Sequence, residues 1–111
     1  SVFAYLAPER THEEVEAALR EVIAEIQENG VTEEEVERAR QQLTAQTAFN
    51  RDGPMKIASQ LNEAIAAGDW TLYTRYLDRL GDVTAADVQR AARTYLRDGR
   101  NTVGWYVPTT Q

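Results

Sequence analysis

The sequence predicts an α+β domain in which a helical layer packs on an antiparallel sheet. Apolar and aromatic residues fill two extended-type stretches near the ends of the chain, at residues 2–7 and 102–107. Between them, apolar residues recur every three or four positions, which is the period of an amphipathic helix. With 111 residues, 42% of them hydrophobic, the chain is long enough for one domain and its core. We therefore expect residues 1–111 to form a single domain.

Both extended stretches are predicted to be strands. Val2–Ala7 is followed by Pro8, which interrupts extended pairing, and Thr102–Val107 ends before Pro108. Two strands alone make a poor sheet, because three or more are usually needed for independent stability. The chain also begins without an initiator methionine. We therefore expect it to be a truncated lobe of a longer protein, with further strands before Ser1.

Two amphipathic helices are predicted in the first half of the chain. Thr11 can cap a helix whose apolar stripe consists of Val15, Ala18, Leu19, Val22, Ile23 and Ile26. Asn29 and Gly30 should end it, because glycine readily adopts the left-handed conformation of a helix terminus. Thr32 and Glu35 have the spacing of a capping box for the second helix. Val36, Ala39 and Leu43 should form its buried side.

Three more helices are predicted in the second half. Pro54 breaks the path of the second helix and suits the first turn of a third, which carries Ile57, Leu61, Ala64 and Ile65. Asp69 is a candidate N-cap for a short aromatic helix. Thr84, with Asp87 three positions later, should begin the last helix, which ends near Asp98 and Gly99.

The composition excludes several kinds of site. There are 12 Lys and Arg residues against 18 Asp and Glu, a formal net charge of -6 that disfavours a nucleic-acid surface. Cysteine is absent, which excludes disulfides, thiol nucleophiles and cysteine zinc sites. His12 is the single histidine, so no His-x-x-Glu-His zinc motif exists within the chain. No run of residues has the length and apolar character of a membrane span.

Four segments, in order and spacing, resemble the pitrilysin/insulinase family of zinc metallopeptidases, which includes mitochondrial processing peptidases. They are VTEEEVERARQQL at 31–43, GDW at 68–70, VTAADVQRAARTYL at 83–96 and RNTVGWYVP at 100–108. Capped amphipathic helices are common, so each segment alone is weak. The ordered set is more specific, because together with the intervening residues it covers nearly the whole chain.

The resemblance implies a clam-shell peptidase built from repeated α+β lobes that enclose a peptide between two halves. In such enzymes an inverted His-x-x-Glu-His motif and a later Glu hold zinc, and the motif Glu acts as general base. No position of this chain matches those residues, so the resemblance assigns it no catalytic, cofactor-binding or metal-binding residue. It implies instead the non-catalytic, C-terminal half of a lobe, with zinc in the catalytic lobe of the parent protein. The compartment that the resemblance implies is the bacterial periplasm or cell envelope.

Three local patterns could carry chemistry, and each has a structural interpretation that we favour. His12 and Glu16 lie one helical turn apart, but two ligands are too few for zinc, so we expect an ordinary exposed first-turn histidine. The acidic run at 33–37 is explained by helix capping and the helix dipole. Trp70, Tyr73 and Leu77 share a helical face, which favours core packing over a peptide-binding patch.

Trp105 and Tyr106 are the best candidates for peptide contact. Successive side chains of a strand point to opposite faces, so one ring should face the helices and the other should face away. In a clam-shell enzyme the outward face of such a sheet could line the substrate chamber.

The leading functional hypothesis is a non-catalytic lobe of a zinc metalloendopeptidase that supports the catalytic lobe and helps to enclose the peptide substrate. Its partner would be a catalytic lobe of the same chain or of a partner subunit. The alternative is a binding or assembly subunit of a family member that lacks the zinc motif. A third possibility is an unrelated helical interaction domain. A His-x-x-Glu-His motif upstream in the same reading frame would separate the first hypothesis from the second.

Overall fold

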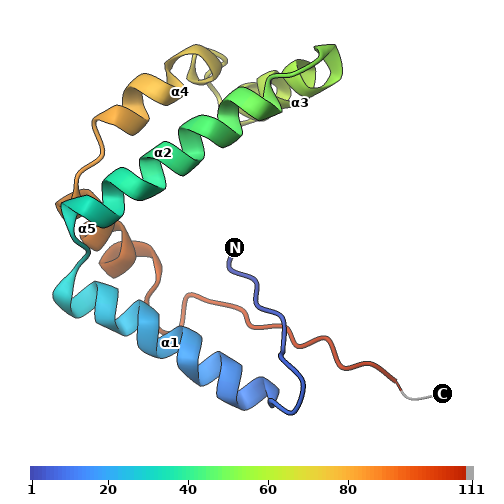
Figure 1. Ribbon diagram of the computed structural model, residues 1–111, viewed down its shortest axis with the longest axis vertical. Coiled ribbons are helices and arrows are strands. Elements are labelled where there is room, and N and C mark those ends of the chain that lie inside the picture. The colour runs from blue at the N-terminus through green and yellow to red at the C-terminus, as the bar shows by residue number, and fades with distance from the viewer. Residues whose placement is uncertain (110–111) are drawn as a thin grey trace. The chain divides into compact units, whose positions relative to one another are not determined.

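The computed structural model describes residues 1–109, and within them the regular structure consists of five α-helices (Figure 1). Their bounds are α1 His12–Asn29, α2 Glu33–Asn50, α3 Pro54–Ala66, α4 Leu72–Gly81 and α5 Ala85–Tyr95. All five predicted helices are present, but the last ends at Tyr95 and not near Asp98 and Gly99 as predicted. None of the helices in this part of the chain combines the length and apolar character needed to cross a membrane.

The first two helices begin with capping boxes. The Thr32 hydroxyl accepts a hydrogen bond from the Glu35 amide, and the Glu35 carboxylate accepts one from the Thr32 amide at 2.8 Å. Thr11 and Glu14 form the same reciprocal pair at the start of α1. Each box satisfies two backbone amides that the helix itself leaves without acceptors. The predicted helix starts at Thr11 and Thr32 are therefore confirmed.

The start of α4 differs from the prediction. Asp69 is not its N-cap, because the helix begins at Leu72 and its N-cap residue is Thr71. The Asp69 carboxylate instead accepts hydrogen bonds from the amide and the hydroxyl of Thr71. A short side chain that bonds the backbone two residues ahead forms an Asx-turn. The Asp69 carboxylate is therefore bonded within this turn and does not cap the first turn of α4.

The helices belong to two compact units, each described here by itself. The continuous unit comprises residues 31–85, with α2, α3 and α4. The discontinuous unit comprises residues 1–30 together with the chain from Ala86 onward, and contains α1 and nearly all of α5. The prediction of a single domain over 1–111 stays a prediction.

In the continuous unit, α4 packs against both α2 and α3. Val36 and Thr47 are buried on α2, and Ala64 is buried on α3. The Thr47 hydroxyl donates to the Leu43 carbonyl one turn earlier, which satisfies a polar group inside the packed region. Many larger apolar side chains stay exposed, including Phe49 at 72% and Met55 at 82%. The core of this unit is therefore thin.

In the discontinuous unit, the C-terminal ends of α1 and α5 cap each other. The Gln27 side-chain amide donates to the Ala92 and Leu96 carbonyls at 3.1 and 2.9 Å. In return, the Gln89 amide donates to the Gln27 and Glu28 carbonyls, both at 3.2 Å. Arg93 adds a contact of 2.6 Å to the Gln27 carbonyl. The last turn of α1 carries no basic residue of its own, so α5 supplies the donors that its end lacks.

The predicted antiparallel sheet is wrong for the described residues. Neither Val2–Ala7 nor Thr102–Val107 is a strand, and no sheet forms within residues 1–109, so the structure is helical and not α+β. A strand requires a neighbour for its backbone hydrogen bonds, and neither segment has one here. Their apolar side chains remain in solvent, with Phe3 83% and Tyr5 97% exposed. A composition typical of strands is therefore not sufficient to form a sheet without a neighbouring strand.

Candidate functional site

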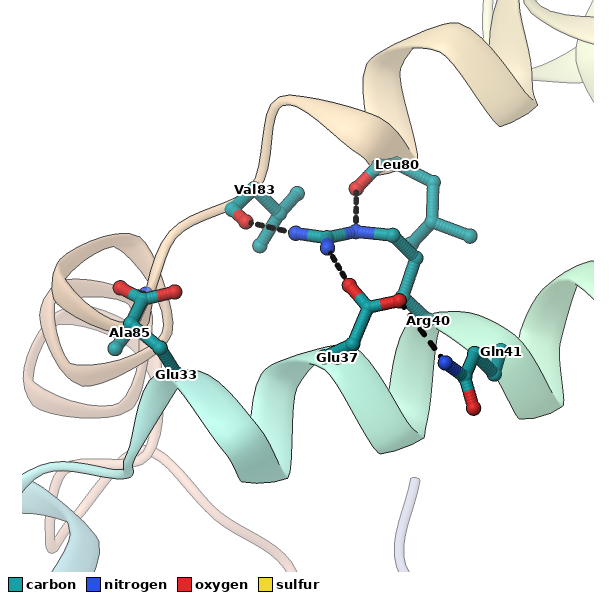
Figure 2. A network of polar contacts seen from close by, with 7 residues as sticks. All are labelled: Glu33, Glu37, Arg40, Gln41, Leu80, Val83 and Ala85. Carbon is teal, nitrogen blue, oxygen red and sulfur yellow. Dashed lines mark hydrogen bonds and ion pairs between the residues drawn. The ribbon is translucent and has the colours of Figure 1, made fainter.

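The most connected polar network surrounds Arg40 in the continuous unit (Figure 2). Its guanidinium donates to the Leu80 carbonyl at 3.2 Å and to the Val83 carbonyl at 2.8 Å, and it pairs with Glu37. Leu80 lies in the last turn of α4, where carbonyls lack helical partners. Arg40 therefore fastens α2 to the end of α4 and to the loop that follows. Within the described residues, the hydrogen bonds and the ion pair of Arg40 run to backbone carbonyls or to Glu37, so they are structural.

The acidic run at the start of α2 is built into the same network. Glu35 belongs to the capping box, and Glu33 accepts a hydrogen bond from the Ala85 amide at 3.0 Å. Glu37 pairs with Arg40 and also accepts from the Gln41 amide at 3.1 Å (Figure 2). Glu34 forms a long, exposed pair with Arg38. The predicted stabilising role of this run is confirmed.

His12 and Glu16 both contact the C-terminal segment. The His12 ring stacks on Trp105, with 5.4 Å between ring centroids, and its Nε2 lies 3.0 Å from the Tyr106 carbonyl oxygen. The Trp105 indole Nε1 donates to Glu16 at 3.1 Å. His12 lies in the first turn of α1, as predicted, but it is half-buried and not exposed. The long-range contact was missed because nothing local to His12 points to a residue 93 positions away.

The same contacts decide how Trp105 and Tyr106 differ. Trp105 turns toward α1 and is 47% exposed, whereas the Tyr106 side chain is 86% exposed. The predicted division between an inward and an outward ring is confirmed, although the segment is not a strand. Tyr106 is the outward member of the pair.

The aromatic group on α4 and before it is only partly packed. Tyr73 is half-buried, and the Arg51 guanidinium lies over its ring, 4.5 Å from the centroid. Leu77 is also half-buried. Trp70 is 61% exposed, so its predicted place in the core is wrong. The turn formed by Asp69 delays the start of the helix until Leu72, so Trp70 never joins the helical face of Tyr73 and Leu77.

An open hollow lies within the discontinuous unit, beside the capped ends of α1 and α5. Its lining consists of Ala24, Gln27, Glu28, Arg93, Arg97 and Asp98. Gln27 and Arg93 already serve helix carbonyls there. The remaining charged groups are two carboxylates, Glu28 and Asp98, and one guanidinium, Arg97. We therefore interpret the hollow as a by-product of the side chains that cap the two helix ends.

Comparison with known proteins finds similarity to one family of peptidase domains. Residues 1–43 match the family described as the Peptidase M16 inactive domain. The beta subunit of mitochondrial-processing peptidase from Dictyostelium discoideum is 38% identical over 69 residues, which is 58% of this chain and 14% of that subunit.

Two solved structures resemble nearly the whole chain. One is a predicted zinc protease from Bordetella pertussis Tohama I, with a TM-score of 0.79 and 34% identity. It matches 94% of this chain and 57% of its own. The other is the inactive peptidase domain of a predicted zinc protease from Bordetella parapertussis, with a TM-score of 0.81 and 34% identity. It matches 97% of this chain and 58% of its own.

The chain is thus similar to the M16 peptidase inactive domain. M16 is the pitrilysin/insulinase family, so the resemblance of its four sequence segments to that family is confirmed, as is the prediction of a non-catalytic lobe. The chain spans a little over half the length of the two solved structures and about one seventh of the mitochondrial subunit.

The described residues do not fit the zinc site that the resemblance to this family implies. Zinc needs three or four converging ligands, and the described residues contain no group of three His, Cys, Asp or Glu side chains arranged to hold a metal. His12 already directs its Nε2 at the Tyr106 carbonyl. No hydrolytic step is therefore derived from this chain.

Proposed function

We propose that this chain is a non-catalytic lobe of a zinc-dependent metalloendopeptidase, which supports a catalytic lobe and forms part of the wall that encloses a peptide. The match to an inactive peptidase domain carries this proposal, since the similarity of backbone extends over 94% or more of the chain. The catalytic lobe would belong to the same protein or to a partner subunit, and zinc would be bound there.

The internal contacts of the chain support a holding role. Arg40 and the Gln27–Gln89 pair use their side chains to bind carbonyls at helix ends, which is a structural role. In a multi-lobe enzyme, rigid helices of this kind would keep the catalytic lobe and the opposing wall at a fixed separation.

Tyr106 is the side chain that we assign to peptide contact. Its ring is 86% exposed, while its carbonyl is held by His12. A tyrosine ring offers a large, stiff contact surface with a hydroxyl at its rim, which suits the side chains and backbone of an extended peptide. The preceding residue, Trp105, is turned to α1 and would not take part.

The non-catalytic assignment is tested on the purified chain. We expect elemental analysis after dialysis to find zinc far below one equivalent, and a quenched fluorogenic peptide mixture to remain uncleaved. Adding the catalytic lobe of the same protein should restore cleavage. Stoichiometric zinc together with proteolysis by the chain alone would overturn the proposal.

The peptide contact is tested in the protein that contains both lobes. We expect Tyr106→Ala to weaken binding of a fluorescein-labelled casein digest roughly five- to tenfold, as measured by anisotropy, since an aromatic contact contributes about 1 kcal/mol or more. Tyr95→Ala removes another exposed tyrosine of the same unit and is the matched control. Equal affinities for the two variants would remove Tyr106 from the proposed binding surface.

A further inference from the structure

One stripe of polar residues on α1 holds the returning C-terminal segment at three points. His12, Glu16 and Arg20 follow one another at intervals of four residues, so they lie along one face of the helix. Their partners on the C-terminal side are Tyr106, Trp105 and Asp98, at 3.0, 3.1 and 3.5 Å. All six residues belong to the discontinuous unit.

The contact at His12 has a defined polarity. A carbonyl oxygen can only accept, so the His12 Nε2 must carry the hydrogen that it donates to Tyr106. The same ring stacks on Trp105 at an interplanar angle of 26°. One histidine therefore holds two consecutive residues of the segment, one through its edge and one through its face.

Glu16 is the central anchor of the stripe. One of its oxygens is taken by Arg20, which binds it at 2.8 and 2.9 Å, and the other accepts the Trp105 indole hydrogen at 3.1 Å. Arg20 thus fixes the carboxylate so that its second oxygen faces the segment. A hydrogen bond to a charged acceptor is stronger than one between neutral groups.

The segment has no other attachment of this kind within the described chain. None of residues 101–109 takes part in a backbone–backbone hydrogen bond, and every one of them is exposed. The segment is therefore held by a few side-chain contacts, unlike the helices, whose backbones bond internally.

We propose that residues 101–109 form a strap, latched to α1 by Glu16 and His12, that opens and closes without unfolding α1. Opening breaks the indole and carbonyl contacts together, because both belong to adjacent residues of one extended segment. In the closed state the latch keeps Trp105 on α1 and Tyr106 outward. The open state releases the Trp105 ring and the backbone of the strap. The strap stands independently of the function proposed above.

The test follows the two indole hydrogens of the uniformly ¹⁵N-labelled 111-residue chain by NMR. Trp70 lies in the other unit and serves as the internal reference. We expect the Trp105 indole hydrogen to exchange with water more slowly than that of Trp70. Glu16→Gln keeps the shape of the side chain but removes its charge, and it should accelerate exchange at Trp105 about tenfold while the helical circular dichroism is unchanged.

Two further variants sharpen the result. Glu13→Gln removes an equivalent charge from the first turn of α1 and should leave exchange at Trp105 unchanged, as the matched control. His12→Phe keeps a ring for stacking but loses the donor, and it should accelerate exchange by a smaller factor. If Trp105 exchanges as fast as Trp70 in the unmodified chain, or if Glu16→Gln and Glu13→Gln behave alike, there is no latch. Loss of helical signal in Glu16→Gln would show that strap and helix open together, which also contradicts the proposal.

Discussion

The continuous and the discontinuous unit solve the same problem in different ways. Both must satisfy helix carbonyls with a thin core, in which Val36, Ala64 and Ala92 are the buried apolar residues of the described chain. The continuous unit uses one charged side chain, Arg40, to serve the end of α4 and the following loop. In the discontinuous unit, neutral glutamines on α1 and α5 each donate to carbonyls of the other helix, and Arg93 adds a further donor. Removing one residue should therefore damage the continuous unit more.

Arg40→Ala is expected to have the largest effect on stability. It removes the side-chain donor of the Val83 carbonyl, leaves the Leu80 carbonyl with backbone donors alone, and leaves Glu37 without its cation. The Arg40 side chain is only 26% exposed. We expect a loss of about 2–3 kcal/mol in the free energy of unfolding, measured by urea denaturation.

The control for this change lies on the same helix. Arg38 is 69% exposed and pairs with Glu34 at 3.9 Å, so Arg38→Ala should cost less than about 0.5 kcal/mol. Equal losses for the two arginines would mean that the network in Figure 2 contributes nothing beyond an exposed ion pair.

Gly30→Ala tests the reciprocal caps of the discontinuous unit. Gly30 has φ +75°, and an added Cβ would lie 3.2 Å from the Gln89 side chain. Backbone strain and displacement of Gln89 should together cost about 1–2 kcal/mol in the free energy of unfolding.

A double variant separates the two causes of that loss. If displacement of Gln89 contributes, Gly30→Ala should cost less in a chain that already carries Gln89→Ala than in the unmodified chain. Strictly additive losses would show that only the backbone conformation of Gly30 matters. Gly104→Ala, at a glycine with open space around it, is the control.

Asp69 should give the smallest effect, visible as a dependence on pH. Hydrogen bonds from the Thr71 hydroxyl and amide lower the pKa of Asp69 below its ordinary value. A lowered folded-state pKa means that the carboxylate adds stability above the pKa of the unfolded chain. That contribution is lost as the pH falls through the lower, folded-state value.

Asp69→Asn is the variant that isolates this contribution. Its unfolding midpoint should approach that of the unmodified chain as the pH falls below about 4 and should lie below it at neutral pH. Asp52→Asn, on the exposed turn after α2, serves as the control. A difference that grows on acidification would contradict the assigned sign.

The local parts of the fold were predictable from the sequence. Thr32 with Glu35, Thr11, Gly30 and Pro54 mark helix boundaries through chemistry that acts within a few residues, and the structure places them at those boundaries. Asp69 misled the prediction because the same short carboxylate can cap a helix or form a turn.

The failures and omissions concern distant contacts. The two extended segments have strand composition, yet a strand exists only with a partner, which no local pattern supplies. The contacts of Arg40 with Leu80, and of His12 with Tyr106, join residues 40 and 94 positions apart. The resemblance to a peptidase family was readable because it rests on the order of local segments.

The mutual capping of α1 and α5 has a consequence for folding during synthesis on the ribosome. Gln27 is synthesised well before Gln89. The whole continuous unit, residues 31–85, is synthesised between the two parts of the discontinuous unit. At about 5–20 residues per second, α1 waits roughly 3–12 s for the Gln89 side chain that completes its end. The continuous unit can fold during that interval, so the end of α1 is completed only after residues 31–85 have been made.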